Sequence, residues 1–106
     1  MKKNWRRYEV MLPLQFNDGS EIPAALRGEA VLDIVNHFGG ASYQSQPIEG
    51  HWVHEGTHYQ DNHARLVVDV PDTVKNRKWM KQFKARWKEQ MNQLELWMVS
   101  YRIDIE

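Results

Sequence analysis

The sequence predicts an α+β protein with the ferredoxin-like order β-α-β-β-α-β. Residues near both ends of the chain alternate between apolar and polar, as strands with one buried face do. Two longer segments, 22–40 and 71–93, repeat apolar residues at the three- and four-residue spacing of amphipathic helices. Between them, residues 41–70 hold two strand-like stretches around a short polar loop. This order predicts a four-stranded antiparallel sheet with both helices on one face. A length of 106 residues predicts one domain over 1–106.

A loop separates the first strand from the first helix. Residues 8–16 place alternate apolar side chains on one face, and Pro13, on the other face, predicts a bulge or an unpaired position. The sequence NDGS at 17–20 is typical of a loop. Pro23 suits the first helical position, where its missing N–H costs nothing. Gly39 is well placed as the left-handed residue that ends the helix.

The central segment predicts a hairpin of two strands. The first strand begins at residue 41, is interrupted at Pro47 and resumes towards 50–53, while the second covers 58–70. Gly56, in the loop between them, is typical of a short hairpin turn.

The second helix and a last strand complete the chain. Asp72 or Thr73 can cap the helix by accepting hydrogen bonds from its first free N–H groups. The apolar stripe of this helix comprises Met80, Phe83, Trp87, Met91 and Leu94, with Trp79 at its edge. In the final segment, 94–106, alternation predicts a strand through Val99, Tyr101, Ile103 and Ile105.

Three short motifs extend over most of the chain. They are Phe38-Gly39-Gly40 at the end of the first helix, Gly50-His51-Trp52 in the hairpin, and the apolar run from Leu66 to Val70. In these motifs the chain resembles small ferredoxin-like proteins of bacteria. The resemblance implies the fold and brings no catalytic residues, because this fold hosts many unrelated functions.

The composition limits the cofactors and partners. The absence of cysteine excludes disulfides, thiolate metal sites and cysteine nucleophiles, and it agrees with a cytoplasmic location. No apolar run approaches the roughly 18 residues of a membrane helix, and none follows the basic N-terminus as in a signal peptide. The 14 basic and 14 acidic residues balance, which argues against strong non-specific binding of nucleic acid.

Residues 49–63 contain four of the five histidines. A three-residue loop, 55–57, would pair His51 with Asp61 and Glu49 with His63 on one face of the hairpin. His51, Asp61 and His63 could then bind a divalent metal such as zinc. Alternatively, His51 and Asp61 could form an acid–base pair. An exposed polar hairpin without chemistry is the commoner interpretation, since no standard metal-binding motif is present.

The sheet face away from the helices is the favoured interaction surface. It is expected to carry Met11, Trp52, Leu96 and Met98, together with Trp97 if a bulge shifts the last strand. Exposed apolar residues favour burial against a partner, most simply a second copy of the chain in a homodimer. The predicted function is therefore a homo-oligomeric interaction or small-ligand-binding module that uses this face. The alternative is a metal-dependent or acid–base enzyme centred on hairpin 49–63.

A further alternative is weak RNA binding by the basic helix 73–92. Seven cations lie between residues 75 and 88, and Lys81, Lys84 and Lys88 could contact phosphates. The aromatic residues of this helix are spaced four apart, which places them on its apolar stripe and not among the cations. A solvated basic face is the usual role of such a run.

Overall fold

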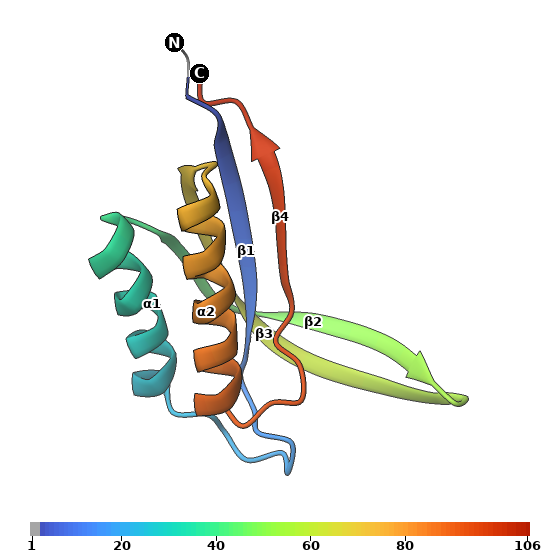
Figure 1. The fold of residues 1–106 in the computed structure, drawn as a ribbon. Coiled ribbons are helices and arrows are strands. Elements are labelled where there is room, and N and C mark those ends of the chain that lie inside the picture. The colour runs from blue at the N-terminus through green and yellow to red at the C-terminus, as the bar shows by residue number, and fades with distance from the viewer. Residues whose placement is uncertain (1–2) are drawn as a thin grey trace.

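The computed structural model describes residues 3–106 and has the ferredoxin-like architecture expected from the sequence (Figure 1). The elements are β1 (Trp5–Pro13), α1 (Ala24–Phe38), β2 (Ser42–His54), β3 (Thr57–Pro71), α2 (Val74–Gln90) and β4 (Met98–Ile103). The strands form one antiparallel sheet in the order β2-β3-β1-β4. Both helices cover the same face of this sheet. Neither helix in the described part of the chain is long and apolar enough to cross a bilayer.

The core lies between the helices and the two central strands. In β1, Tyr8, Val10 and Leu12 are buried, because every second side chain of a strand points to the same face. The buried residues that α2 adds to this core are Met80, Phe83 and Trp87. Leu94, expected to continue that stripe, is instead 89% exposed, since α2 ends at Gln90.

The helix ends follow the local sequence. Gly39 ends α1 with a φ of 91°, a left-handed conformation that glycine adopts without strain. The hydroxyl of Thr73 caps α2 by accepting a hydrogen bond from the Asn76 N–H at 3.1 Å. Pro23 lies one position earlier than predicted and precedes α1 as its cap residue.

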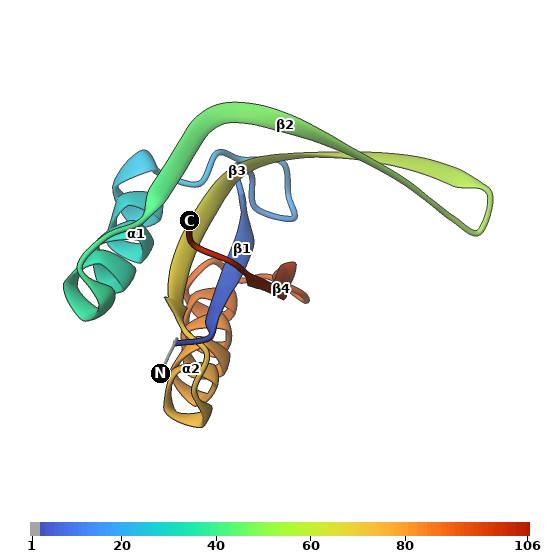
Figure 2. The ribbon, with the colours of Figure 1, turned by 90° about the horizontal axis from the view of Figure 1, so that it is seen from above.

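A long β2–β3 hairpin projects from the body of the molecule (Figures 1 and 2). Near its base the pairing register shifts between Gln44 and Ile48, at the interruption predicted around Pro47. At its tip, Glu55 and Gly56 have φ of 49° and 78°, so they form a two-residue turn of the primed type. The predicted three-residue loop is therefore wrong, and His54 pairs with Thr57.

The parity of β4 is also opposite to the expectation. Met98 pairs with buried Val10 and packs against the core, and Leu96 is only 1% exposed. Leu96 and Met98 thus lie on the helix side of the sheet and not on the open face. Residues 96–99 are apolar in both parities, and beyond them the outward positions are the more apolar ones, so the period-two pattern indicated the wrong face. As a result, Val99 and Tyr101 face outward.

Candidate functional site

The two-residue turn separates the predicted histidine cluster onto two faces of the hairpin. His51 pairs with Gln60, whereas Asp61 pairs with Gly50 and His63 with Ile48. Since side chains alternate along a strand, His51 lies on the face opposite to Asp61 and His63. The predicted acid–base pair and metal ligand set therefore do not converge. Within residues 3–106, no three His, Asp or Glu side chains are grouped so as to hold a metal ion.

Trp52 organises the hairpin face that continues the open side of the sheet. Its indole N–H donates a hydrogen bond of 2.7 Å to Oδ2 of Asp61. Its ring stacks on Tyr59, the residue paired with it across the hairpin, with the ring centres 4.3 Å apart. Sequence reasoning missed Tyr59, although a two-residue turn at Glu55-Gly56 would have placed it beside Trp52. The hydrogen bond from Trp52 holds the carboxylate of Asp61 in place through Oδ2. Oδ1 of Asp61 takes no part in that hydrogen bond.

His63 lies at the base of the hairpin against Gly50. A Cβ atom at Gly50 would lie 3.2 Å from Cε1 of the imidazole, so glycine makes room for the ring. Burial lowers the pKa of His63 from its ordinary value, and the nearby carboxylate of Asp61 opposes this shift. The ring is therefore held preferentially in its neutral form, which can both donate and accept a hydrogen bond.

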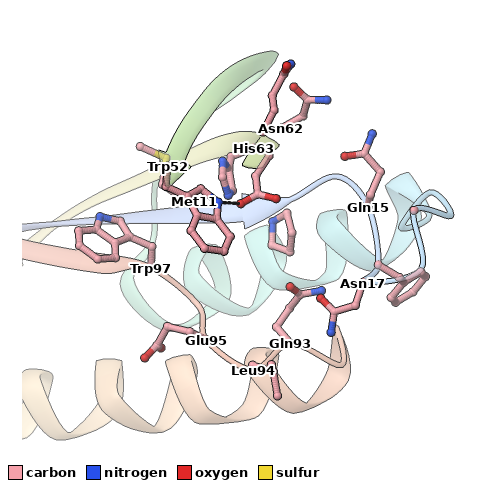
Figure 3. A pocket seen from close by; sticks show the side chains of 15 residues that line it. Met11, Gln15, Asn17, Trp52, Asn62, His63, Gln93, Leu94, Glu95 and Trp97 are labelled. Atoms are coloured by element: carbon pink, nitrogen blue, oxygen red, sulfur yellow. Dashed lines mark hydrogen bonds between the residues drawn. The ribbon is translucent and has the colours of Figure 1, made fainter. Parts of the chain in front are cut away.

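A groove of about 1100 Å³ opens between the hairpin base, the end of β1 and the α2–β4 connection (Figure 3). Among the apolar residues that line it are Met11, Pro13, Phe16, Trp52, Leu94 and Trp97. Trp97 is 64% exposed and Trp52 is 47% exposed, a large amount of accessible aromatic surface for one groove. The predicted surface residues Met11 and Trp52 thus line this groove, whereas Leu96 and Met98 do not.

The polar lining of the groove is acidic and amide-rich. It includes Gln15, Asn17, Gln60, Asn62 and Gln93 as well as the carboxylates Asp61 and Glu95, and no lysine or arginine is among the described residues that line it. Glu95 pairs with Lys84 at 3.0 Å, and that hydrogen bond is the main cause of its lowered pKa.

The rest of the open sheet face is charged and internally paired. Arg7 binds Asp69 through two hydrogen bonds of 2.8 and 3.0 Å. Glu9 accepts hydrogen bonds from Arg65 and from the Tyr101 hydroxyl, and the Tyr101 bond is the first cause of its lowered pKa. These paired side chains satisfy one another, so the aromatic groove is the part of this face best suited to a ligand.

Among the basic residues of α2, Lys84 borders this groove, because it pairs with the groove-lining Glu95. Lys81, Lys84 and Lys88 line a shallow hollow together with Glu89 and Glu95. Phe83 and Trp87 are buried, and Trp79 stacks on His37 with ring centres 4.1 Å apart. The exposed His37, in the last turn of α1, thus contacts α2 through Trp79, and the rings of Phe83 and Trp87 are not displayed beside the lysines.

No family model matches the sequence, and no curated protein matches it. In three dimensions the chain is similar to CutA1 from Oryza sativa, with a TM-score of 0.68, 10% identity and coverage of 98% of this chain and 84% of that one. It is similar to the divalent cation tolerance protein CutA1 from Thermus thermophilus, with a TM-score of 0.67, 12% identity and coverage of 96% and 86%. A phage SAM lyase in complex with S-methyl-5′-thioadenosine gives a TM-score of 0.69, 11% identity and coverage of 100% and 94%. At these identities the likeness concerns the fold: the chain has the ferredoxin-like α+β fold that the CutA1 proteins also have.

Proposed function

We propose that this chain is a small-ligand-binding module and that the groove beside Trp52 and Trp97 is its binding site. The observation that carries the proposal is the exposure of two tryptophans beside fixed polar groups. An exposed indole leaves apolar area in contact with water, and covering it with a flat ligand is favourable. Asp61 and His63 can orient such a ligand, as a few convergent polar groups do in small-molecule sites.

The lining selects the chemistry of the ligand. Stacking on indole favours a planar ring, and the amides of Gln15, Asn17 and Asn62 offer hydrogen-bond donors and acceptors to a heterocycle or to hydroxyl groups. The carboxylate of Asp61 disfavours phosphate and favours a neutral or positively charged molecule, whereas the charge of Glu95 is offset by its ion pair with Lys84. A nucleoside fits this description better than a nucleotide.

The comparison with the phage SAM lyase supports a nucleoside as the first probe. That enzyme was solved with S-methyl-5′-thioadenosine, an uncharged nucleoside thioether, and its fold covers this whole chain. The likeness lies in the fold, so the proposal rests on the groove of this chain and not on inherited residues.

Calorimetric titration of the purified protein with S-methyl-5′-thioadenosine, adenosine and adenosine monophosphate tests the proposal. We expect the two nucleosides to bind more tightly than the monophosphate. Replacing Trp97→Ala should weaken nucleoside binding roughly 5- to 150-fold, since stacking of a base on an aromatic ring contributes about 1–3 kcal/mol. Ile105→Ala removes another exposed apolar side chain, outside the groove, and should leave the affinity unchanged.

Two results would contradict the proposal. One is the failure of both nucleosides to bind the unaltered protein. The other is equal affinity in the Trp97→Ala protein, which would place any binding outside the groove.

Self-association is a second proposal, supported by β4. This strand is at the edge of the sheet, with one side paired to β1 and the other side unpaired within the described chain. Its outward residues Val99 and Tyr101, and Trp97 just before it, are apolar or aromatic and exposed. An edge strand of this composition is a template for pairing with a second chain, because its free N–H and C=O groups need partners. The predicted homodimer would then form through β4 of each copy.

A further inference from the structure

The hairpin face opposite the groove brings two histidines into contact. Nδ1 of His51, on β2, lies 2.9 Å from Nε2 of His58, on β3. The two residues are diagonal neighbours across the hairpin, since His51 pairs with Gln60 and His58 with Val53. Nε2 of His51 lies 3.3 Å from a carboxylate oxygen of Glu49, two residues earlier on the same face. A carboxylate, an imidazole and a second imidazole thus form a chain on this face.

The proton positions follow from these contacts. Glu49 can only accept, so Nε2 of His51 donates to it and Nδ1 of the neutral ring keeps its lone pair. This lone pair accepts the hydrogen bond from Nε2–H of His58. A metal cation can take the place of the proton shared by the two rings. For this, His58 must carry its proton on its own Nδ1 and leave its Nε2 free to bind the metal. The carboxylate beside His51 is the arrangement that orients metal-binding histidines in many proteins and makes them more basic.

The separation of the two nitrogens is compatible with a pair of neighbouring ligands in a square-planar site. Metal–nitrogen bonds of about 2.0–2.1 Å place neighbouring nitrogens about 2.9 Å apart in a square-planar site and about 3.4 Å apart in a tetrahedral one. The contact of 2.9 Å is the length of an ordinary N–H···N hydrogen bond, and it is also close to the square-planar value, so the two nitrogens need little change in separation to bind a cation. Each ring would have to turn its lone pair from the line between the nitrogens towards the shared cation.

We propose that His51 and His58 form a binding site for a divalent transition-metal ion of tetragonal preference, Cu²⁺ or Ni²⁺, with Glu49 orienting His51. Water fills the remaining coordination positions, because the protein offers two ligands here. The side chain of His51 is 46% exposed, so the metal enters directly from solvent. Imidazole nitrogens suit these two ions, and Cu²⁺ binds nitrogen ligands more tightly than Ni²⁺ or Zn²⁺.

The other two histidines of the hairpin supply a matched control. His54 lies at the tip beside Glu55, at 3.8 Å, and by strand parity belongs to the opposite face. His63 is half-buried against Gly50 and is not facing a second imidazole. A His54→Ala variant therefore removes one exposed histidine of the same hairpin without touching the proposed site.

Titration of the untagged protein with Cu²⁺, followed by calorimetry and by electron paramagnetic resonance, tests the site. We expect one Cu²⁺ per chain, with a tetragonal spectrum and hyperfine coupling to two nitrogens. His51→Ala and His58→Ala should each weaken binding at least tenfold, and Glu49→Gln should weaken it about tenfold, as the loss of such an orienting carboxylate does. His54→Ala should bind as the unaltered protein does, and far-ultraviolet circular dichroism checks that each variant is folded.

The proposal fails if the double variant His51→Ala, His58→Ala binds Cu²⁺ as tightly as the unaltered protein. It also fails if His54→Ala loses as much affinity as His51→Ala, because binding would then be shared among unrelated imidazoles. A preference for Zn²⁺ over Cu²⁺ would overturn the square-planar assignment.

Discussion

Gly50 and His63 show how a single residue shapes the candidate groove. The imidazole of His63 packs over the bare Cα of Gly50, and the next residue on this face of β2 is Trp52, which holds Asp61. The spacing Gly50-x-Trp52 thus has a structural reason: glycine admits the ring and tryptophan fixes the carboxylate. The side chains of His63 and Trp52 both line the groove in which ligand binding is proposed.

Replacing Gly50→Ala is expected to displace the His63 ring. The added Cβ would lie 3.2 Å from Cε1, tighter than an ordinary contact, so the ring must give way by a few tenths of an ångström. An outward shift reduces the burial that lowers the pKa of His63, and its pKa should therefore rise towards the ordinary value of about 6.5 in the variant. Titration of the His63 Cε1–H resonance by NMR measures this shift.

Gly40→Ala is the control for this prediction, because a Cβ there meets nothing within 4 Å. An unchanged His63 pKa in Gly50→Ala, with the fold intact, would mean that the two residues are not coupled. In the unaltered protein, the lowered pKa also means that protonating His63 opposes folding, so its contribution to stability decreases as the pH falls below about 6.5.

At the scale of the elements, Asp72 joins three of them. Its buried carboxylate, only 1% exposed, accepts hydrogen bonds from Arg6 of β1, Arg77 of α2 and Arg102 of β4, at 3.0 to 3.1 Å. The hydrogen bonds from Arg77 and Arg6 are the largest causes of a strongly lowered pKa at Asp72. The residue considered from sequence as a helix cap instead anchors the far end of the sheet, while Thr73 caps α2.

Asp72→Asn should lower the melting temperature at pH 7 by several degrees, because three guanidinium groups lose their charged partner. In the unaltered protein, a lowered pKa gives stability that is present above the ordinary carboxyl pKa of about 3.9 and is lost as the pH falls below it. The difference between the two proteins should therefore shrink as the pH is lowered from about 4. Melting curves by circular dichroism between pH 2 and pH 7 measure it, with exposed Asp104→Asn as the control. A difference independent of pH would contradict this account.

The elements themselves could be predicted from the sequence, but their pairing could not. Alternation located the strands, and the spacing of Met80, Phe83 and Trp87 located the buried side of α2. The hairpin register depended on whether Glu55 and Gly56 form the whole turn, and a one-residue error moves every side chain to the other face. For the same reason the sequence predicts His51 beside Asp61 and not its contact with His58. Strand β4 was assigned the wrong parity because its position is fixed by β1 and not by its own pattern.

At the scale of the whole molecule, β4 predicts how copies of the chain meet. Val99, the second residue of this edge strand, points outward and is 38% exposed. If two β4 strands pair, a lysine at this position places like charges close together across the interface and should disrupt it.

Light scattering on a sizing column is expected to give a dimer mass for the unaltered protein and a monomer mass for Val99→Lys. Val74→Lys introduces the same charge at an exposed valine of α2, away from the sheet edge, and should leave the dimer intact. A monomer in the unaltered protein, or a dimer that survives Val99→Lys, would refute pairing through β4.

The β2–β3 hairpin is only two strands wide, and this has an evolutionary consequence. One surface of the hairpin carries the even-numbered residues of β2 and the odd-numbered residues of β3, including Trp52, Tyr59 and Asp61. The opposite surface carries the remaining residues, including His51 and His58. The bulge between Gln44 and Ile48 adds two residues to β2 relative to β3, and an even number preserves this division. Substitutions can therefore alter the residues of one surface while leaving the other surface unchanged. Inserting a single residue into one strand would instead either change the bulge or move the side chains of that strand to the opposite surface.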